Sequence, residues 1–113
     1  GKPGNRERAF KQLKSFSGQM VRFLSAVHVR CENRSFQFSE TVTTHVAFRT
    51  LADDEIARYL DMDKPFDCAG SFKSEQAGIS LLESLDSADP TAIVGLPLIA
   101  TAAALRAAGF PVP

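Results

Sequence analysis

A lysine and a glutamate two residues apart give the segment Cys68–Glu75 the strongest chemical character in this sequence. The segment reads C-A-G-S-F-K-S-E, and its last four residues contain Lys73 and Glu75. If the segment is a β-strand, Lys73 and Glu75 project to the same face. Gly70 and Gly78 flank this face and permit close approach of another backbone or of a planar ligand. A solvated lysine–glutamate surface pair is the competing interpretation.

The other residues with ligand or acid–base chemistry do not group in the sequence. His28 and His45 are the only histidines. No serine lies in a G-x-S-x-G elbow, so a nucleophilic triad is not indicated. Five acidic residues surround one short helix, where they suit the helix dipole and a solvated face. These residues are Asp53, Asp54, Glu55, Asp61 and Asp63. We therefore expect no metal site in this chain.

Composition excludes several classes of partner. The 113 residues contain 13 Lys+Arg and 13 Asp+Glu, so the formal net charge is zero and favours neither nucleic acid nor an anionic membrane surface. The apolar stretch Ala92–Leu105 is too short to span a bilayer, and we interpret it as a buried strand end followed by a core helix. Cys31 and Cys68 are not in a C-x-x-C motif, which favours two buried free thiols in a reducing cytoplasm.

Two long segments with apolar residues at every second position predict a β-hairpin, Gln19–Cys31 followed by Ser35–Arg49. Their apolar faces coincide if Glu32 lies opposite Ser35, and a slip of one residue would oppose apolar to polar faces. This register places His28 opposite Ser39, with His45 roughly 20 Å further along, too far to share a metal ion. A two-residue turn and a four-residue loop are both compatible with it.

Helical periodicity and capping signals predict the helices, at Asn5–Ser17, Ala52–Met62 and from Pro97 to about Ala108. Cys68–Glu75 and Ile79–Leu85 are expected as further strands, and the strand end expected at the start of Ala92–Leu105 makes five. The fold class is therefore α/β, a mixed sheet with flanking helices. Residues 1–113 form one small domain, or a fragment of one.

Four short motifs, in this order and spacing, resemble the Maf family, also called septum-formation inhibitor-like proteins. The motifs are Gly1-Lys2-Pro3, the stretch Thr43–Leu51 with Asp54-Glu55-Ile56 and Tyr59, the segment Cys68–Glu75, and Val94–Leu98. The resemblance extends over the whole chain. It implies the C-terminal part of a fold similar to that of the inosine triphosphate pyrophosphatases.

The resemblance also implies an activity. The family hydrolyses nucleoside triphosphates to monophosphate and pyrophosphate with a divalent metal, Mg or Mn. Members that read A-G-x-Y-x-I-Q act on dTTP and UTP, whereas those that read A-G-S-F-K-S-E, as here, act on 7-methyl-GTP. Guanine presents two N–H donors on one edge, and a carboxylate is an acceptor only. The resemblance therefore assigns base selection to Glu75, places Lys73 beside it, and puts Lys2 near the triphosphate.

The family's S-x-x-R phosphate loop and its general-base aspartate lie N-terminal to the G-K-P motif. We therefore expect no catalytic residue in this chain, little or no activity of the chain alone, and no bound metal. We expect a nucleoside triphosphate ligand and a homodimer. The alternative function is a non-catalytic dimerisation or nucleotide-binding module. An unrelated α/β interaction domain is a third interpretation.

Overall fold

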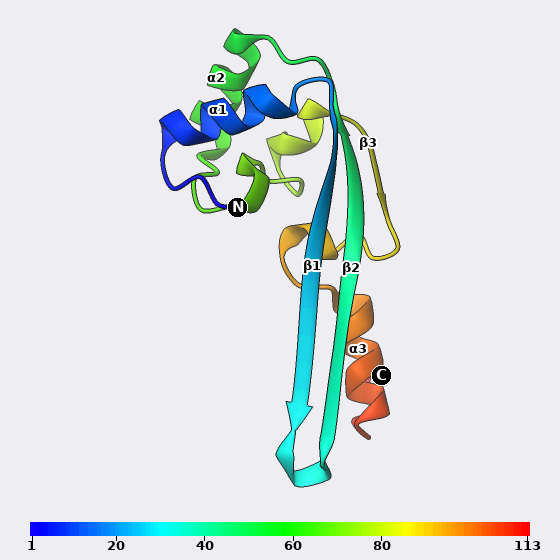
Figure 1. Cartoon of the computed structure of the whole chain (residues 1–113). Helices are drawn as coiled ribbons and strands as arrows, with labels where there is room; N and C mark the ends of the chain where they lie inside the picture. The colour runs from blue at the N-terminus through cyan, green and yellow to red at the C-terminus, as the bar shows by residue number, and fades with distance from the viewer. The chain divides into compact units, whose positions relative to one another are not determined.

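The computed structural model describes residues 1–113 and confirms the α/β class (Figure 1). The helices are α1 (Arg6–Phe16), α2 (Asp53–Asp63) and α3 (Leu98–Ala107), and the strands are β1 (Met20–Cys31), β2 (Phe36–Phe48) and β3 (Leu82–Ser87). Short 3₁₀ turns lie at Glu32–Arg34, Ala69–Ser71, Ala77–Leu81 and Ala92–Val94. The strands form one sheet in the order β1-β2-β3.

The predicted hairpin and its register are confirmed. The N–H of Phe48 donates to the carbonyl of Gln19 at 2.9 Å, and the ring of His28 lies 2.6 Å from the hydroxyl of Ser39. Both pairs obey the same register as Glu32 opposite Ser35. The loop has four residues, and Ser35 takes the left-handed conformation with φ of 49°. Of the two predicted connections, the structure therefore has the longer.

The sheet has three strands, and the prediction of five is corrected. Cys68–Glu75 is not a strand, because Gly70 and Ser71 take left-handed φ values of 77° and 62° that break the extended conformation. The strand expected at Ile79–Leu85 begins only at Leu82, because Ala77–Leu81 forms a 3₁₀ turn. β3 is antiparallel to β2: the N–H of Arg49 donates to the carbonyl of Leu81 at 2.9 Å. The parallel pairing that a mixed sheet requires is thus absent from these three strands.

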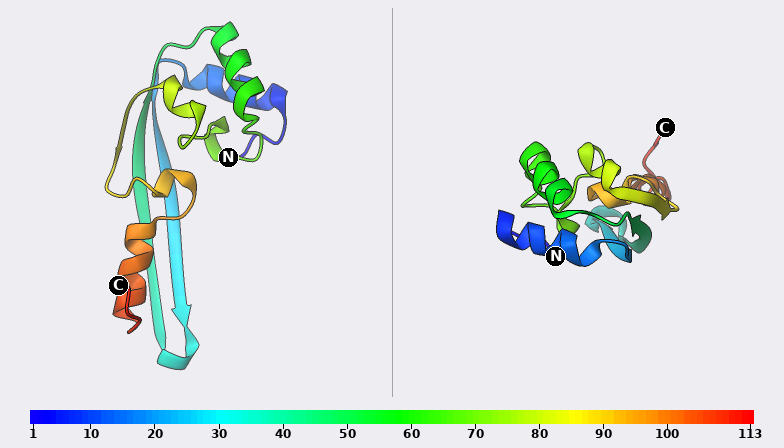
Figure 2. Two further views of the ribbon diagram at one scale, coloured as in Figure 1. Left: turned by 180° about the vertical axis from the view of Figure 1, so that it is seen from behind. Right: turned by 90° about the horizontal axis from the view of Figure 1, so that it is seen from above.

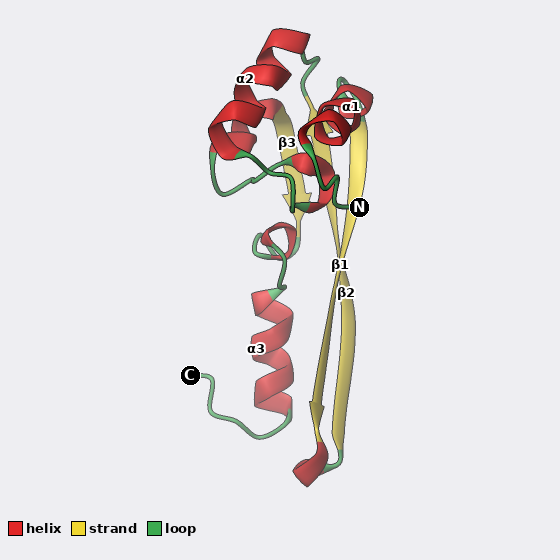
Figure 3. Cartoon of the chain, turned by 90° about the vertical axis from the view of Figure 1, so that its left-hand side faces the viewer, coloured by secondary structure: helices red, strands yellow, loops and turns green.

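The chain divides into two compact units. The first contains residues 1–21 and 45–85, with α1, α2 and the turns between α2 and β3 (Figure 2). Its buried apolar side chains include Leu13, Phe48, Ile56 and Leu60. The second contains residues 22–44 and 86–113, with most of the hairpin and α3 (Figure 3).

Helix starts in the first unit agree with the predictions only in part. Asn5 caps α1 as predicted, because its side chain accepts the N–H of Arg8 at 2.9 Å. α2 begins differently: its N-cap is Ala52, and Glu55 reaches back to accept the N–H of Ala52 at 3.0 Å. This bond, followed by the bond from Arg49, lowers the pKa of Glu55. Thr50 and Asp53 therefore do not form the predicted start signal.

α3 in the second unit begins without a cap of its own. Pro97 precedes it, and the carboxylate of Asp89 takes the role of the cap by accepting the N–H of Ile99 at 2.8 Å. The same carboxylate accepts the N–H of Thr91 at 3.0 Å and its hydroxyl proton. Asp89 is 2% exposed. Burial alone would raise the pKa of Asp89, but the bonds from Thr91, Ile99 and Ala100 outweigh burial and lower it.

α3 is less buried than predicted. Only Ala100 and Ala104 are buried within it, whereas Leu98 and Ile99 are 51% and 57% exposed. The expectation of a core helix is therefore wrong, because α3 buries only these two alanines and leaves Leu98 and Ile99 exposed. Cys31 and Cys68 are likewise only half-buried, and both are free thiols.

We predict that Asp89→Ala lowers the midpoint of thermal unfolding by several degrees, because the N–H groups of Thr91 and Ile99 lose their acceptor. Circular dichroism during heating measures it. Asp86→Ala is the control, since Asp86 is exposed and three residues away.

A second substitution at this position, Asp89→Asn, tests a pH dependence. A lowered pKa in the folded state means that the charged Asp89 stabilises the fold at neutral pH, and this stabilisation is lost as the pH falls through that pKa. The difference in stability between wild type and Asp89→Asn should therefore shrink below about pH 4. A constant difference from pH 7 to pH 3 contradicts the assignment.

Candidate functional site

A cavity of about 580 Å³ in the first unit brings two of the predicted substrate-binding residues together. Its lining residues are Lys2, Gly4, Asp63, Lys64, Phe66, Asp67 and Lys73. Lys2 and Lys73 are 71 positions apart in the sequence. Three ammonium groups outnumber two carboxylates here, so the cavity is cationic although the chain is neutral. A cavity of this charge suits a polyanion such as a phosphate ester.

Backbone hydrogen bonds hold Lys2 at the cavity. The carbonyl of Gly1 accepts the side-chain amide of Gln12 at 3.2 Å and the N–H of Gly70 at 3.4 Å. On the other side, the N–H of Gly4 donates to the carbonyl of Phe66 at 2.8 Å. Lys2 thus has a fixed backbone, whereas its side chain stays exposed.

The two residues that precede Lys73 are buried. Ser71 is fully buried, and its hydroxyl donates to the side-chain carbonyl of Gln12 in α1. Phe72 is 5% exposed and packs edge-on against Phe48, with ring centroids 5.4 Å apart. The chain then leaves the interior at Lys73, whose side chain is half-buried and lines the cavity.

Tyr59 contributes to the candidate site through a hydrogen bond with Lys73, and the sequence interpretation did not identify it. The pattern places it on the apolar face of a helix, and it is indeed 3% exposed on α2. Its hydroxyl, however, accepts the backbone N–H of Lys73 at 2.7 Å. Burial raises the pKa of Tyr59 far above its ordinary value, the Lys73 bond opposes this, and the nearby Asp63 carboxylate adds to the rise. The hydroxyl is therefore neutral at neutral pH.

Glu75 lies apart from the cavity lining. It is exposed, two residues beyond Lys73. The expectation that Lys73 and Glu75 share the face of a strand is wrong, since this segment is a 3₁₀ turn followed by extended and turn residues. The expectation for Gly78 is confirmed: a Cβ atom there would lie 2.4 Å from the carbonyl oxygen of Lys73. Gly70 instead serves a left-handed turn.

The carboxylates and the thiol around the cavity have distinct environments. One oxygen of Asp63 is buried with no hydrogen-bond partner. The thiol of Cys68 lies 3.6 Å from the carboxylate of Asp67, and burial, followed by Asp67, raises the pKa of Cys68. A thiol with a raised pKa is a poor nucleophile. The cavity therefore offers charge, hydrogen-bond acceptors and the ring of Phe66, which are features for binding a ligand.

No three His, Cys, Asp or Glu side chains of the 113 residues are grouped closely enough to hold a metal ion. None of the three helices has the length and apolar character that crossing a bilayer would require.

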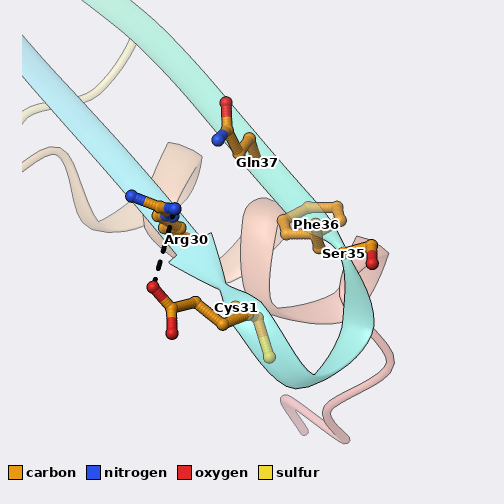
Figure 4. A pocket seen from close by; sticks show the side chains of 6 residues that line it. Arg30, Cys31, Ser35, Phe36 and Gln37 are labelled. Carbon is orange, nitrogen blue, oxygen red and sulfur yellow. Dashed lines mark ion pairs between the residues drawn. The ribbon is translucent and has the colours of Figure 1, made fainter.

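A second cavity, also of about 580 Å³, lies at the tip of the hairpin in the second unit (Figure 4). It is lined by Arg30, Cys31, Glu32, Ser35, Phe36 and Gln37. Arg30 and Glu32, two of these lining residues, form an ion pair at 3.5 Å. It contains none of the predicted substrate-binding residues, and its charged side chains are largely exposed. The cavity that contains Lys2 and Lys73 is therefore the stronger candidate.

Comparisons with known proteins agree with the predicted family. A family model described as "Maf-like protein" matches residues 1–108. A protein of Polaromonas sp. (strain JS666 / ATCC BAA-500) named 7-methyl-GTP pyrophosphatase is 53% identical over 109 residues, which are 96% of this chain and 50% of the relative. Proteins of the same name are 49% identical in Albidiferax ferrireducens and 52% identical in Xanthomonas axonopodis pv. citri.

The last two matches cover 99% and 100% of this chain, but 56% and 58% of the relatives. The chain thus spans about half the length of the curated relatives it matches.

Proposed function

The chain belongs to the Maf-like family, and from this premise we propose that it forms the nucleotide-binding part of a nucleoside-triphosphate pyrophosphatase. The observation that carries the proposal is the cationic cavity that contains both Lys2 and Lys73. Lysine ammonium groups bind phosphate oxygens through charge-assisted hydrogen bonds. Lys2 contacts the triphosphate, and Lys73 contacts the same nucleotide. A cytoplasmic location is part of the proposal, because thiols such as Cys31 and Cys68 stay reduced there.

The proposed substrate is 7-methyl-GTP, the nucleotide in the names of the relatives. Methylation at N7 makes the base cationic, which strengthens its N–H bonds to a carboxylate. Glu75 is the proposed base-selecting residue, and its carboxylate is exposed. Because Glu75 is two residues beyond Lys73, a ligand that contacts Lys73 from the cavity can extend its base towards Glu75.

The complete enzyme is proposed to use a divalent metal, which would neutralise phosphate charge and activate a water molecule. The residues of this chain do not fit a metal site, since no three ligand side chains are grouped. We therefore assign binding of the base and the phosphates to these 113 residues, and derive no hydrolytic step from them.

We predict that Glu75→Gln reduces the preference for 7-methyl-GTP over dTTP by about tenfold, because an amide presents an N–H group to the donor edge of guanine. Titration calorimetry with 7-methyl-GTP, GTP and dTTP measures the ratio of dissociation constants. Glu83→Gln, an exposed change in β3, should leave that ratio unaltered. An unchanged preference in Glu75→Gln would sink the assignment of base selection.

Lys2→Met should weaken binding of all three triphosphates by about tenfold without altering the preference among them, because phosphate is common to all. Added salt should weaken nucleotide binding by the wild type more than binding by the variant, because the variant lacks one ion pair with the ligand. Lys11→Met is the matched control: Lys11 is an exposed lysine of α1, paired with Glu7 at 3.4 Å. Equal affinities of wild type and Lys2→Met would contradict the phosphate role.

A second candidate function, self-association, is favoured by exposed apolar side chains in the second unit. Val94, Leu96, Leu98 and Ile99 are each about half exposed, and three of them line a shallow cavity of about 380 Å³. Apolar surface of this kind is typical of protein interfaces. We propose that a second copy of the chain covers it.

Analytical ultracentrifugation tests this proposal. We predict a dimer for the wild type and a monomer for Ile99→Glu, because a charge would have to be desolvated at the interface. Ala103→Glu, an exposed change on α3, controls for added charge. A monomeric wild type at all accessible concentrations rules out the homodimer.

A further inference from the structure

We infer that Tyr59 and Gly78 are positioning residues that hold the backbone of Lys73 in place, so that its ammonium group meets the bound nucleotide in a fixed position. The inference rests on the proposed function of the cavity, but its structural part does not. Neither residue lines the cavity. Both lie against the backbone of Lys73, which does line it.

Tyr59 fixes the N–H side of Lys73. Its hydroxyl oxygen accepts this N–H at 2.7 Å, and the donor and acceptor belong to segments 14 residues apart. The tyrosine ring is buried in α2, so its own position is determined by core packing. The hydroxyl is protonated and uncharged at neutral pH, so it offers the N–H a neutral acceptor. Without it, the N–H of Lys73 would lose its protein partner.

Gly78 and Gln76 fix the carbonyl group of Lys73. The N–H of Gln76 donates to the carbonyl of Lys73 at 3.1 Å, which closes a tight turn. Gly78 then passes so close to Lys73 that a Cβ atom would lie 2.4 Å from its carbonyl oxygen, 2.8 Å from its carbonyl carbon and 2.9 Å from its nitrogen. These atoms are backbone and cannot turn away. Any larger residue at position 78 would therefore displace Lys73 itself.

The consequence for ligand binding follows from the flexibility of lysine. A lysine side chain has a flexible four-carbon stem and loses conformational entropy when a bound ligand orders it. A fixed backbone limits this loss to the side chain and places the origin of the side chain at the cavity wall. The buried Ser71 and Phe72 reinforce this, because they prevent the segment before Lys73 from moving.

Tyr59→Phe is the decisive variant, because it removes only the hydroxyl and keeps the buried ring. Ser17→Ala is a matched control: Ser17 Oγ accepts the N–H of Leu51, also at 2.7 Å, in the same unit but away from the cavity. Both variants leave one backbone N–H without its acceptor. A purely structural role for Tyr59 predicts similar effects of the two changes on nucleotide affinity.

We expect Tyr59→Phe to weaken binding of 7-methyl-GTP by about three- to tenfold, the worth of one hydrogen bond, and Ser17→Ala to leave it within twofold. In the Lys73→Met background, Tyr59→Phe should have no further effect on affinity, because the ammonium group that it positions is gone. Equal losses in Tyr59→Phe and Ser17→Ala, or an undiminished loss in the Lys73→Met background, overturn the inference.

A second measurement separates this inference from the proposed function. Amide hydrogen exchange, followed by NMR in the absence of nucleotide, should become faster at Lys73 in Tyr59→Phe, and at Leu51 instead in Ser17→Ala. If the wild type bound no nucleotide, the proposed function would fail. Unchanged exchange at Lys73 in Tyr59→Phe would overturn the positioning role, whatever the binding result.

Discussion

The hydrogen-bond ladder between β1 and β2 is the constraint on which the rest of the structure depends. Its register is defined at one end by Phe48 opposite Gln19 and further along by His28 opposite Ser39. Because side chains alternate between faces, a slip of one residue would turn Val46 and Phe48 outward and remove them from the core. The four-residue loop at the tip fits this register without the glycine that a tighter turn requires.

In the first unit, aromatic packing connects the end of β2 to the candidate site. Phe48, at the end of β2, contacts Phe16 of α1 with centroids 5.2 Å apart and Phe72 with centroids 5.4 Å apart. Phe72 directly precedes Lys73. Correct pairing of the hairpin thus places the ring that holds the segment of Lys73, while α1 supplies Gln12 to both Gly1 and Ser71. The cavity is lined by two segments, residues 2–4 and 63–73, that are far apart in the sequence.

The sequence could predict the features that depend on neighbouring residues, but not those that depend on contacts between distant ones. The period-two pattern of the hairpin and the cap at Asn5 are local signals, and both predictions are confirmed. The alternation of Phe72 and Lys73 resembles a strand, but the left-handed Gly70 and Ser71 reflect tertiary contacts that no local pattern encodes. The apolar face of α2 correctly includes Tyr59, yet the partner of its hydroxyl lies 14 residues away. Proximity of Lys2 and Lys73 was implied only by the family resemblance.

The chain is neutral but the cavity is cationic, because some charged side chains form ion pairs and others do not. Most surface ions of the first unit are paired locally, such as Arg6 with Asp61 at 2.7 Å and Arg49 with Glu55 at 3.0 Å, and such pairs produce little field at a distance. Lys2 and Lys73 form no ion pair in the structure, and both face the same cavity. In the proposed function, nucleotide binding by this unit depends on these two unpaired ammonium groups, and the bond from the N–H of Lys73 to the hydroxyl of Tyr59 would keep Lys73 in position.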